Sequence, residues 1–368
     1  MAVAFRVDAS PVIGTGHLYR CLTLARLLAS RGETPLFIAR HLPDSLASDV
    51  IDAGFELIRL AGVGERASSA SWCSHAAWLE ANWLDDAAAT REALEGRECD
   101  WLVVDHYALD IQWQSAVRDV CGNLMVIDDL ADRQHLCDVL LDQNYIQDSF
   151  GRYETLVPGN CESLLGPQYA LLRPEFAIAR ESSQPREGAI SRILVFMGGV
   201  DSDNMTGTVL KGIELLDSRT IAVDVVVGSA NLHRHEVEML TRRVRGCRLF
   251  GRVESIVPLI CAADLAVGAA GTTTWERCCL GLPTLTMAIA DNQIPIAEGS
   301  QLGGFAVNLG KSEWVTPELI ARGLEHLLNN PAIVQQMSLA GMRLVDGQGA
   351  ERVADVLANV TEGSLRGA

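Results

Sequence analysis

The sequence contains almost no lysine. Of its 30 basic residues, only Lys211 and Lys311 are lysines. Any clamp for a phosphate or carboxylate must therefore use arginine side chains or backbone amides. The 47 acidic residues give a formal net charge of −17. This acidity argues against a nucleic-acid partner, because binding to phosphates requires clustered Lys and Arg.

The sequence also lacks the patterns of metal-binding, disulfide-rich and membrane proteins. Its ten cysteines form no C-x-x-C pair, so we expect reduced thiols in apolar positions and no metal site. Even the apolar stretch 258–271 contains Asp264, so we expect no membrane association. The first eight residues already include Arg6 and Asp8 and do not resemble a signal peptide. We therefore expect a cytoplasmic protein.

The length of 368 residues and a hydrophobic content of 48% predict a packed protein of two domains. Short apolar segments alternate with helical patterns, which is typical of parallel sheets with helical crossovers. We expect early strands at 3–7, 35–39, 55–60, 101–104, 124–127 and 139–141, and a helix at 17–31.

A polar segment at 180–188, with a proline and a glycine, is the best candidate for a linker. The pattern then restarts with a strand at 193–197, a glycine loop and a helix at about 204–216. We therefore predict an α/β fold of two Rossmann-like, doubly wound domains facing a cleft, which is where such folds bind ligands. The expected domains are 1–180 and 190–345, and a C-terminal helix within 346–368 is expected to pack back on the first domain.

The first candidate site is the sequence Gly14-Thr15-Gly16-His17, between a strand and a helix. Tyr19 stands where a dinucleotide fingerprint needs its third glycine, so no nicotinamide or flavin cofactor is predicted. The imidazole of His17 would lie in the first helical turn, where the positive end of the helix favours the neutral ring. A neutral ring can accept a proton from water. The alternative is a polar residue that only begins the helix.

The second candidate site is the sequence from Gly268 to Thr274, G-A-A-G-T-T-T, which follows a strand and opens a helix. Amides and hydroxyls at a helix start can bind an anion without lysine. An ordinary helix capped by threonine is the alternative.

Three shorter features follow other strands. Gly198-Gly199 allows close approach of a ligand, or simply makes a turn. The sequence Asp105-His106-Tyr107 ends a buried strand, where Tyr107 faces a ligand or packs in the core. The pair Asp128-Asp129 is interpreted as a solvated turn.

Together these segments resemble a known family. They are F-R-V-D-A-S with G-T-G-H-L-Y-R (5–20), V-D-H-Y (104–107), I-D-D-L (127–130), Y-A-L-L-R-P-E-F (169–176), M-G-G-V-D (197–201), G-T-T-T-W-E (271–276) and D-N-Q (291–293). The order of these motifs is similar to that in the UDP-2,4-diacetamido-2,4,6-trideoxy-β-L-altropyranose hydrolases of pseudaminic acid biosynthesis. The resemblance implies a glycosyltransferase-B fold, distantly related to the undecaprenyl-muramoyl peptide N-acetylglucosaminyltransferase.

The resemblance also implies a metal-independent reaction in which water attacks the anomeric carbon, the C–O bond breaks with inversion and UDP leaves. It implies that His17 is the general base and that other matched residues bind the nucleotide sugar. These are Gly16, Arg20, Tyr107, Arg173, Gly199, Thr272, Thr273, Glu276, Asn292 and Gln293. The family usually has Ser-Ser at the Thr272-Thr273 position, a change that preserves the hydroxyl donors.

Two other functions remain open from the sequence. One is a UDP-sugar-dependent glycosyltransferase of the same fold, whose lipid-linked acceptor would call for an apolar, basic patch that is not obvious here. The other is a non-catalytic nucleotide-sugar binding protein, which would have no use for a base at residue 17. A monomer without a cofactor is favoured.

Overall fold

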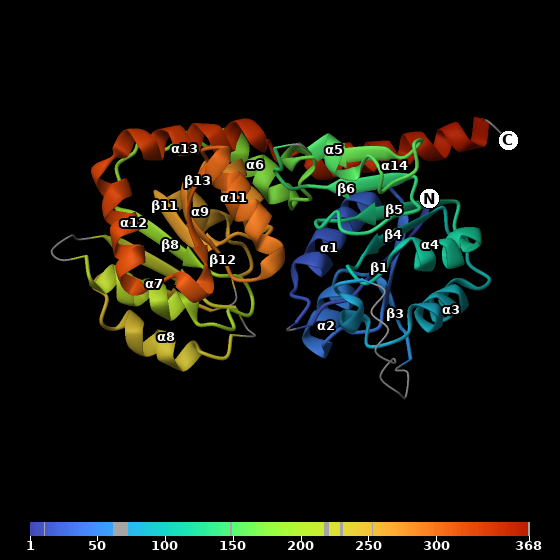
Figure 1. Ribbon diagram of the computed structural model, residues 1–368, viewed down its shortest axis with the longest axis horizontal. Helices are drawn as coiled ribbons and strands as arrows, with labels where there is room; N and C mark the ends of the chain where they lie inside the picture. Colours follow the sequence, from blue (N-terminus) through green and yellow to red (C-terminus); the bar gives the residue numbers. More distant parts are fainter. Residues whose placement is uncertain are drawn as a thin grey trace. The chain divides into compact units, whose positions relative to one another are not determined.

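A computed structural model describes the chain except for Pro11, residues 62–72, Asp148, residues 217–220, residues 229–230, Arg252 and residues 367–368. The chain divides into two compact units. Unit 1 comprises Met1–Asn144, Asp148–Leu171 and Gly349–Ala368, and unit 2 comprises Tyr145–Gln147 and Leu172–Gln348. Each unit contains a parallel sheet with helices on both faces (Figure 1).

Unit 1 contains a seven-stranded parallel sheet in the order β3-β2-β1-β4-β5-β6-β7. Its strands are β1 (Ala2–Val7), β2 (Thr34–Ala39), β3 (Glu56–Arg59), β4 (Trp101–Asp105), β5 (Asn123–Ile127), β6 (Val139–Asp142) and β7 (Glu162–Leu165). The strand order changes direction between β1 and β4. Loops at such a point diverge and leave room for functional side chains.

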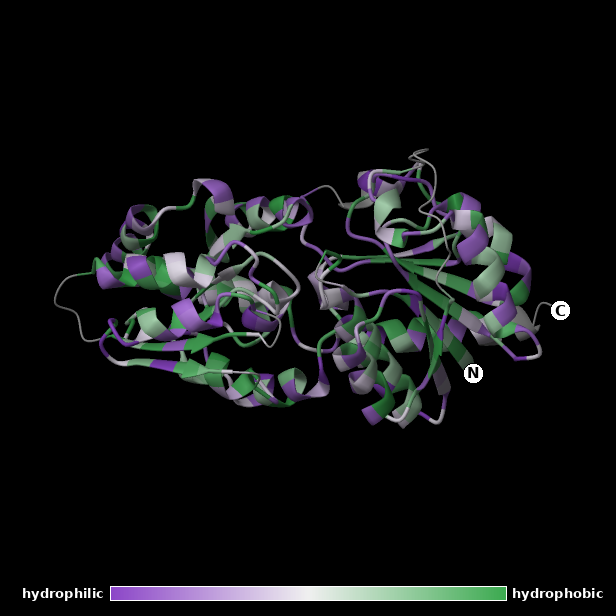
Figure 2. Cartoon of the chain, turned by 90° about the horizontal axis from the view of Figure 1, so that it is seen from below, coloured by the Kyte–Doolittle hydropathy of each residue, from purple (hydrophilic) through white to green (hydrophobic). Residues whose placement is uncertain are grey.

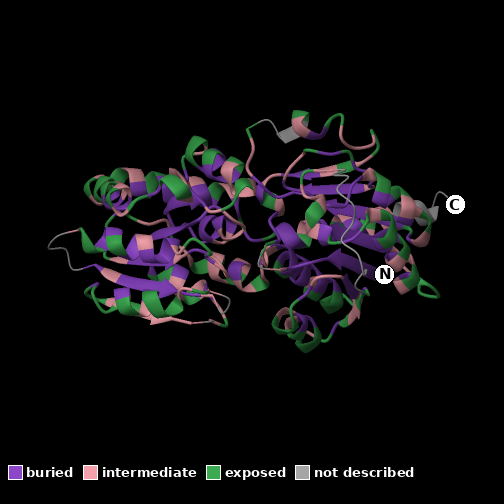
Figure 3. Cartoon of the chain, turned by 60° about the horizontal axis from the view of Figure 1, so that its bottom comes forward, coloured by how far each residue is buried: buried purple, intermediate pink, exposed green. Residues whose placement is uncertain are grey.

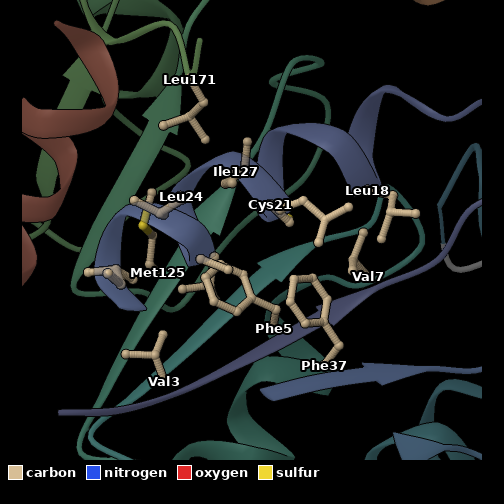
Figure 4. Packing of buried hydrophobic residues seen from close by; sticks show 14 of the residues in the cluster. Val3, Phe5, Val7, Leu18, Cys21, Leu24, Phe37, Met125, Ile127 and Leu171 are labelled. Carbon is tan, nitrogen blue, oxygen red and sulfur yellow. The ribbon is translucent and has the colours of Figure 1, made fainter. Parts of the chain in front are cut away.

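The helices of unit 1 form two layers. Apolar residues of α1 (Gly16–Ser30), α2 (Asp44–Asp52) and α14 (Gly349–Arg366) share one core with alternate residues of the strands, and Figure 4 shows part of it, with Phe5 beside Phe37. Residues of α3 (Trp83–Leu94) and α4 (Ile111–Val117) share the opposite core. The shorter helices are η1 (Ala76–Leu79), η2 (Arg118–Val120), α5 (Ser149–Tyr153) and η3 (Pro167–Tyr169).

Unit 2 contains a six-stranded parallel sheet in the order β10-β9-β8-β11-β12-β13. Its strands are β8 (Arg192–Phe196), β9 (Ala222–Val226), β10 (Cys247–Phe250), β11 (Leu265–Ala269), β12 (Thr284–Ala288) and β13 (Ala306–Lys311). This is the 3-2-1-4-5-6 order of the Rossmann fold, with the change of direction between β8 and β11. The prediction of two Rossmann-like α/β units is therefore confirmed.

Helices cover both faces of the second sheet. One core joins it to α7 (Met205–Glu214), α8 (Arg234–Thr241), α12 (Pro317–Asn329) and α13 (Pro331–Leu344). The remaining helices are α6 (Pro174–Ser182), α9 (Val257–Ala262), α10 (Thr273–Cys279), η4 (Asp291–Gln293), α11 (Ile294–Leu302) and η5 (Ser312–Trp314). The central strands of both units are apolar and buried, whereas the edge strands β3, β10 and β13 are mostly half-buried or exposed, and exposed residues gather on the outer helices (Figures 2 and 3).

The segment 180–188, expected to be a linker, packs on unit 2. The helix α6 extends through its first residues and contacts α9 and α10. The guanidinium of Arg186 donates to the carbonyl oxygens of Ile260, Ala263 and Leu280 at 2.8–3.0 Å. The chain leaves unit 1 at Leu171 instead, nine residues before the expected boundary at 180.

The C-terminal helix α14 belongs to unit 1. It packs on α1, and its Val353, Ala354 and Leu357 are fully buried in the core. The indole of Trp101 on β4 donates to the Thr361 hydroxyl at 2.8 Å. Separately, no helix among the described residues has the length and apolar character needed to cross a membrane.

The burial of α14 predicts that unit 1 depends on it for stability. Leu357→Ala should lower the free energy of unfolding by about 2–5 kcal/mol, because it leaves a cavity in the core. Urea denaturation followed by circular dichroism measures this change. The exposed Asn359 lies on the same helix, and Asn359→Ala should change the free energy by less than about 0.5 kcal/mol. Equal effects of the two variants would contradict a docked helix.

Candidate functional site

The first group of site residues lies in unit 1, where β1 and β4 end side by side. The loop after β1 leads into α1, so His17 lies in the first helical turn. The last residue of β4 is Asp105, and Tyr107 follows two residues later. Because both strands are parallel, their carboxyl ends meet at one edge and bring residues 17 and 105 together.

The imidazole of His17 is bound to a buried carboxylate. Its Nδ1 lies 2.6 Å from Oδ1 of Asp105, and the two side chains are 7% and 0% exposed. Burial opposes ionisation of Asp105, but Arg20 and His17 outweigh it and hold the pKa of this carboxyl well below its usual range. Nδ1 also lies 3.2 Å from Nη2 of Arg20, which can only donate, but the shorter 2.6 Å contact assigns Nδ1–H as the donor of a hydrogen bond to the ionised Asp105. The Nε2 atom of the neutral ring is then the acceptor, with no partner recorded among the described residues.

Arg20, expected to bind substrate, lies inside the protein. Its guanidinium binds both oxygens of Asp105, at 2.6 and 2.7 Å, and reaches Asp129 at 2.8 Å. Asp129 also accepts hydrogen bonds from the Tyr107 hydroxyl at 2.6 Å and the Asn144 amide at 2.7 Å. The polar atoms of Arg20 are therefore directed at carboxylates of this chain.

The interpretation of Asp128-Asp129 as a solvated, capped turn is right about the turn, because Oδ2 of Asp128 accepts from the amide of Ala131 at 2.8 Å, but it is wrong about the solvent. Asp128 is fully buried, and Asp129 is only 9% exposed. Asp128 binds Arg133 at 2.9 Å and accepts from the Tyr153 hydroxyl at 2.9 Å. Burial raises the pKa of the neighbouring Asp142 to about 7, with Asp129 adding to the shift. Arg133, five residues along the chain, and Tyr153, 25 residues along, make this burial possible, and a D-D pattern alone does not reveal them.

An aromatic cluster borders His17. The edge of its ring meets the Tyr107 ring, with centroids 4.6 Å apart. Trp78 stacks on Tyr107 at 5.4 Å, and His75 contacts both rings edge-on. Tyr107 is 2% exposed, and the half-buried Trp78 and His75 and the guanidinium of Arg133 lie against its ring. Trp78 in η1 and His75 just before it were not predicted, because no spacing pattern links them to the end of β4.

The second group of site residues lies in unit 2, on loops after β8, β11 and β12. Gly198 has a φ of +92°, which favours glycine. The carbonyl oxygen of Gly199 lies so close to Gly228 that residue 228 has no room for a side chain. Gln293 in η4 accepts from the backbone amide of Ile289, and its Nε2 lies against Gly271. Asn292 belongs to the same turn. The expected residues on the loops after β11 and β12 are thus neighbours.

A buried arginine, Arg277, binds two hydroxyls of the Thr272–Thr274 segment. Thr272 precedes α10 but makes no side-chain capping bond, so the ordinary threonine cap is not observed. The buried Arg277 donates to the hydroxyl oxygens of Thr273 and Thr274 at 3.1 and 3.2 Å, and to the carbonyl of Ala269. Burial lowers the pKa of Arg277 to about 10, which still leaves it charged at neutral pH. The sequence analysis gave this arginine no role.

Glu276 and Arg173 form the remaining part of this group. Burial raises the pKa of the Glu276 carboxyl to about 7, although Arg173 and Arg277 act in the opposite direction. Arg173 donates to the Glu254 carbonyl, pairs with Glu175 at 2.9 Å and lies over the Phe176 ring. Near neutral pH, Glu276 can therefore gain or lose a proton, which is unusual for a glutamate.

Within the described ranges, no group of three or more His, Cys, Asp or Glu side chains is arranged to hold a metal ion. The chemistry available from the two groups is proton transfer at His17 and hydrogen bonding by amides, hydroxyls and guanidiniums.

Comparisons with known proteins show similar sequences in sugar metabolism. The chain is 27% identical over 212 residues to the spore coat polysaccharide biosynthesis protein SpsG of Bacillus subtilis, covering 57% of this chain and 62% of that protein. It is 24% identical over 312 residues to the UDP-2,4-diacetamido-2,4,6-trideoxy-β-L-altropyranose hydrolase of Campylobacter jejuni, covering 83% of this chain and 98% of the hydrolase. No family model matches the chain.

The fold is that of known glycosyltransferases. The structure of MurG from Acinetobacter baumannii superposes with a TM-score of 0.67 at 15% identity, covering 97% of this chain and 99% of MurG. The strand orders in both units agree with this similarity. The chain therefore has the glycosyltransferase-B fold, with two Rossmann-like units.

Proposed function

We propose that the protein is a nucleotide-sugar hydrolase that releases UDP from UDP-2,4-diacetamido-2,4,6-trideoxy-β-L-altropyranose. The observation that carries this proposal is the buried Asp105–His17 pair, which leaves Nε2 of the imidazole as a proton acceptor. The similarity to the Campylobacter jejuni hydrolase, along 98% of its length, supports the choice of substrate. A binding protein without catalysis would have no need for an oriented base.

In the proposed reaction, Nε2 of His17 takes a proton from water as the water oxygen bonds to the anomeric carbon. The bond between this carbon and the phosphate oxygen breaks, and its electron pair leaves with UDP. Attack opposite the leaving group inverts the anomeric centre. Asp105 stabilises the imidazolium that forms, as the aspartate does in a Ser-His-Asp triad.

Unit 2 is proposed to bind the nucleotide. Hydroxyls and amides of the 271–274 loop, together with Gly199, would bind the diphosphate, whose charge grows as the sugar leaves. The Glu276 carboxylate would accept hydrogen bonds from the ribose hydroxyls. Arg173, Asn292 and Gln293 would contact other parts of the nucleotide sugar. No metal ion or cofactor is part of this proposal.

A glycosyltransferase is the second candidate, because solved structures named as glycosyltransferases share the fold. An assay with purified protein and the UDP-sugar distinguishes the two. A hydrolase releases UDP with no acceptor present, whereas a transferase requires an acceptor. In ¹⁸O-labelled water, C–O cleavage places the label in the sugar and leaves UDP unlabelled. Label in UDP would contradict the proposed bond cleavage.

His17→Asn should lower kcat by about 10²–10⁴-fold, because the substituted side chain cannot accept the proton from water. The dissociation constant for UDP, measured by titration calorimetry, should change less than about threefold, since the nucleotide is assigned to unit 2. The exposed His326 on α12 provides a control. His326→Asn should keep the wild-type rate, and a His17→Asn variant that also kept it would refute the general base.

The raised pKa of Glu276 predicts that nucleotide affinity increases with pH. Below about pH 7 the carboxyl is protonated, and above it the carboxylate is a stronger acceptor for ribose hydroxyls. The ratio of the UDP dissociation constants of Glu276→Gln and wild type should therefore rise about tenfold from pH 6 to 8.5. Titration of UDP itself cancels in this ratio.

The exposed Glu325 on α12 serves as the control for this experiment. Glu325→Gln should give a ratio near one at every pH. A ratio for Glu276→Gln that stays flat between pH 6 and 8.5 would rule out ribose binding by the ionised carboxylate.

A further inference from the structure

Arg20 and His17 bind the same carboxylate. The two residues lie three positions apart on α1, so their side chains project from one face of the helix. Oδ1 of Asp105 lies 2.6 Å from Nδ1 of His17 and 2.7 Å from Nη2 of Arg20, and Oδ2 lies 2.6 Å from Nε of Arg20. Arg20 is 4% exposed and Asp105 is 1% exposed.

The protonation state of Asp105 decides which nitrogen of His17 carries the proton. An ionised carboxylate only accepts hydrogen bonds, so Nδ1 must donate and Nε2 keeps its lone pair. A protonated carboxyl can donate to Nδ1 instead. Nε2 would then carry the ring proton and could not act as a base. A buried carboxyl without a cation favours this neutral form, because burial penalises the charge.

We propose that Arg20 is a positioning residue that fixes the tautomer of His17, by keeping Asp105 an acceptor for the Nδ1 proton. This inference rests on the proposed role of His17 as the general base. The charged and titratable groups that face the His17–Asp105 pair are Arg20, Cys21 at 3.6 Å from Oδ2, and Tyr107 against the imidazole edge. Of these, only Arg20 is a permanent cation.

Asp129 fixes the other edge of the guanidinium. It binds Nη1 of Arg20 at 2.8 Å and is itself held by the Tyr107 hydroxyl and the Asn144 amide. To bind a phosphate, Arg20 would have to leave two buried carboxylates, and each would then lack its cation. This geometry favours a positioning role for Arg20 over the direct substrate contact expected from sequence.

The tautomer can be read by ¹⁵N NMR of the ligand-free protein, with His17→Asn used to assign the signal. At alkaline pH, where Asp105 is ionised and the ring is neutral, every variant should carry the ring proton on Nδ1. As the pH falls and the pair takes up one proton, the wild type and Arg20→Lys should form an imidazolium, with both ring nitrogens protonated, whereas Arg20→Met should protonate Asp105 and carry the ring proton on Nε2 alone. An Arg20→Met ring that passes directly from the Nδ1 form to the imidazolium would overturn the proposal.

A matched control is available on β1, where Arg6 is also buried and binds the two carboxylates Asp8 and Asp86. Arg6→Met removes a comparable buried guanidinium and should leave the protonation of His17 as in the wild type. If Arg6→Met changed it as Arg20→Met does, the change would reflect general loosening of unit 1 and the proposal would fail.

Kinetics provide a second test through a double-mutant cycle. Asp105→Asn should lower kcat by about 10³–10⁴-fold. Arg20→Met should lower kcat by about 10²–10³-fold in the wild-type background but less than about threefold in the Asp105→Asn background, because Arg20 acts through Asp105. A raised KM that persists in both backgrounds would show a direct substrate contact and overturn the proposal. If the wild type releases no UDP, the proposed function fails, and the NMR measurement still decides the role of Arg20.

Discussion

Carboxyl groups buried at the edge of a parallel sheet need cations inside the protein to stay ionised, and this requirement organises unit 1. Four of its strands end at, or are followed directly by, a buried aspartate, and each of these aspartates binds a different arginine. The pairs are Asp8 with Arg6, Asp105 with Arg20, Asp128 with Arg133 and Asp142 with Arg152. Removing one partner of such a pair costs about 3–5 kcal/mol, because the other charge stays buried. The loops at this edge are therefore held by charge as well as by apolar packing.

The shortage of lysine fits this architecture. Arg6 and Arg20 each bind two carboxylates with one planar group, which the single ammonium of a lysine cannot reproduce with the same geometry. Arginine also stays charged when buried, as Arg277 shows with a pKa that remains near 10. In an acidic chain with a net charge of −17, these inward-facing guanidiniums place positive charge beside the carboxylates buried at the ends of the strands.

Local pattern predicted the fold and the position of His17, but it did not predict the partners of the site residues. Alternating strands and helices are visible in short windows, and a histidine between glycines and a helix start is a local signal. Asp105 lies 88 residues from His17, and only the strand order brings the two together. The same limit explains part of the burial of Asp128, because Tyr153 lies 25 residues along the chain, whereas Arg133 is only five residues away. It also explains the segment 180–188, where polarity suggested a linker although Arg186 is bound to three carbonyl oxygens.

The two units prepare opposite chemistry at equivalent points of their sheets. In unit 1, Asp105 accepts a hydrogen bond from Nδ1 of His17, so Nε2 keeps its lone pair. In unit 2, Arg277 donates to the oxygens of Thr273 and Thr274, so each hydroxyl keeps its own proton for another acceptor. The buried Asp105 thus leaves the imidazole of His17 with a free acceptor atom. The buried Arg277 leaves the two threonine hydroxyls as donors. The proposed hydrolysis needs a proton acceptor for water and hydrogen-bond donors for the anionic leaving group.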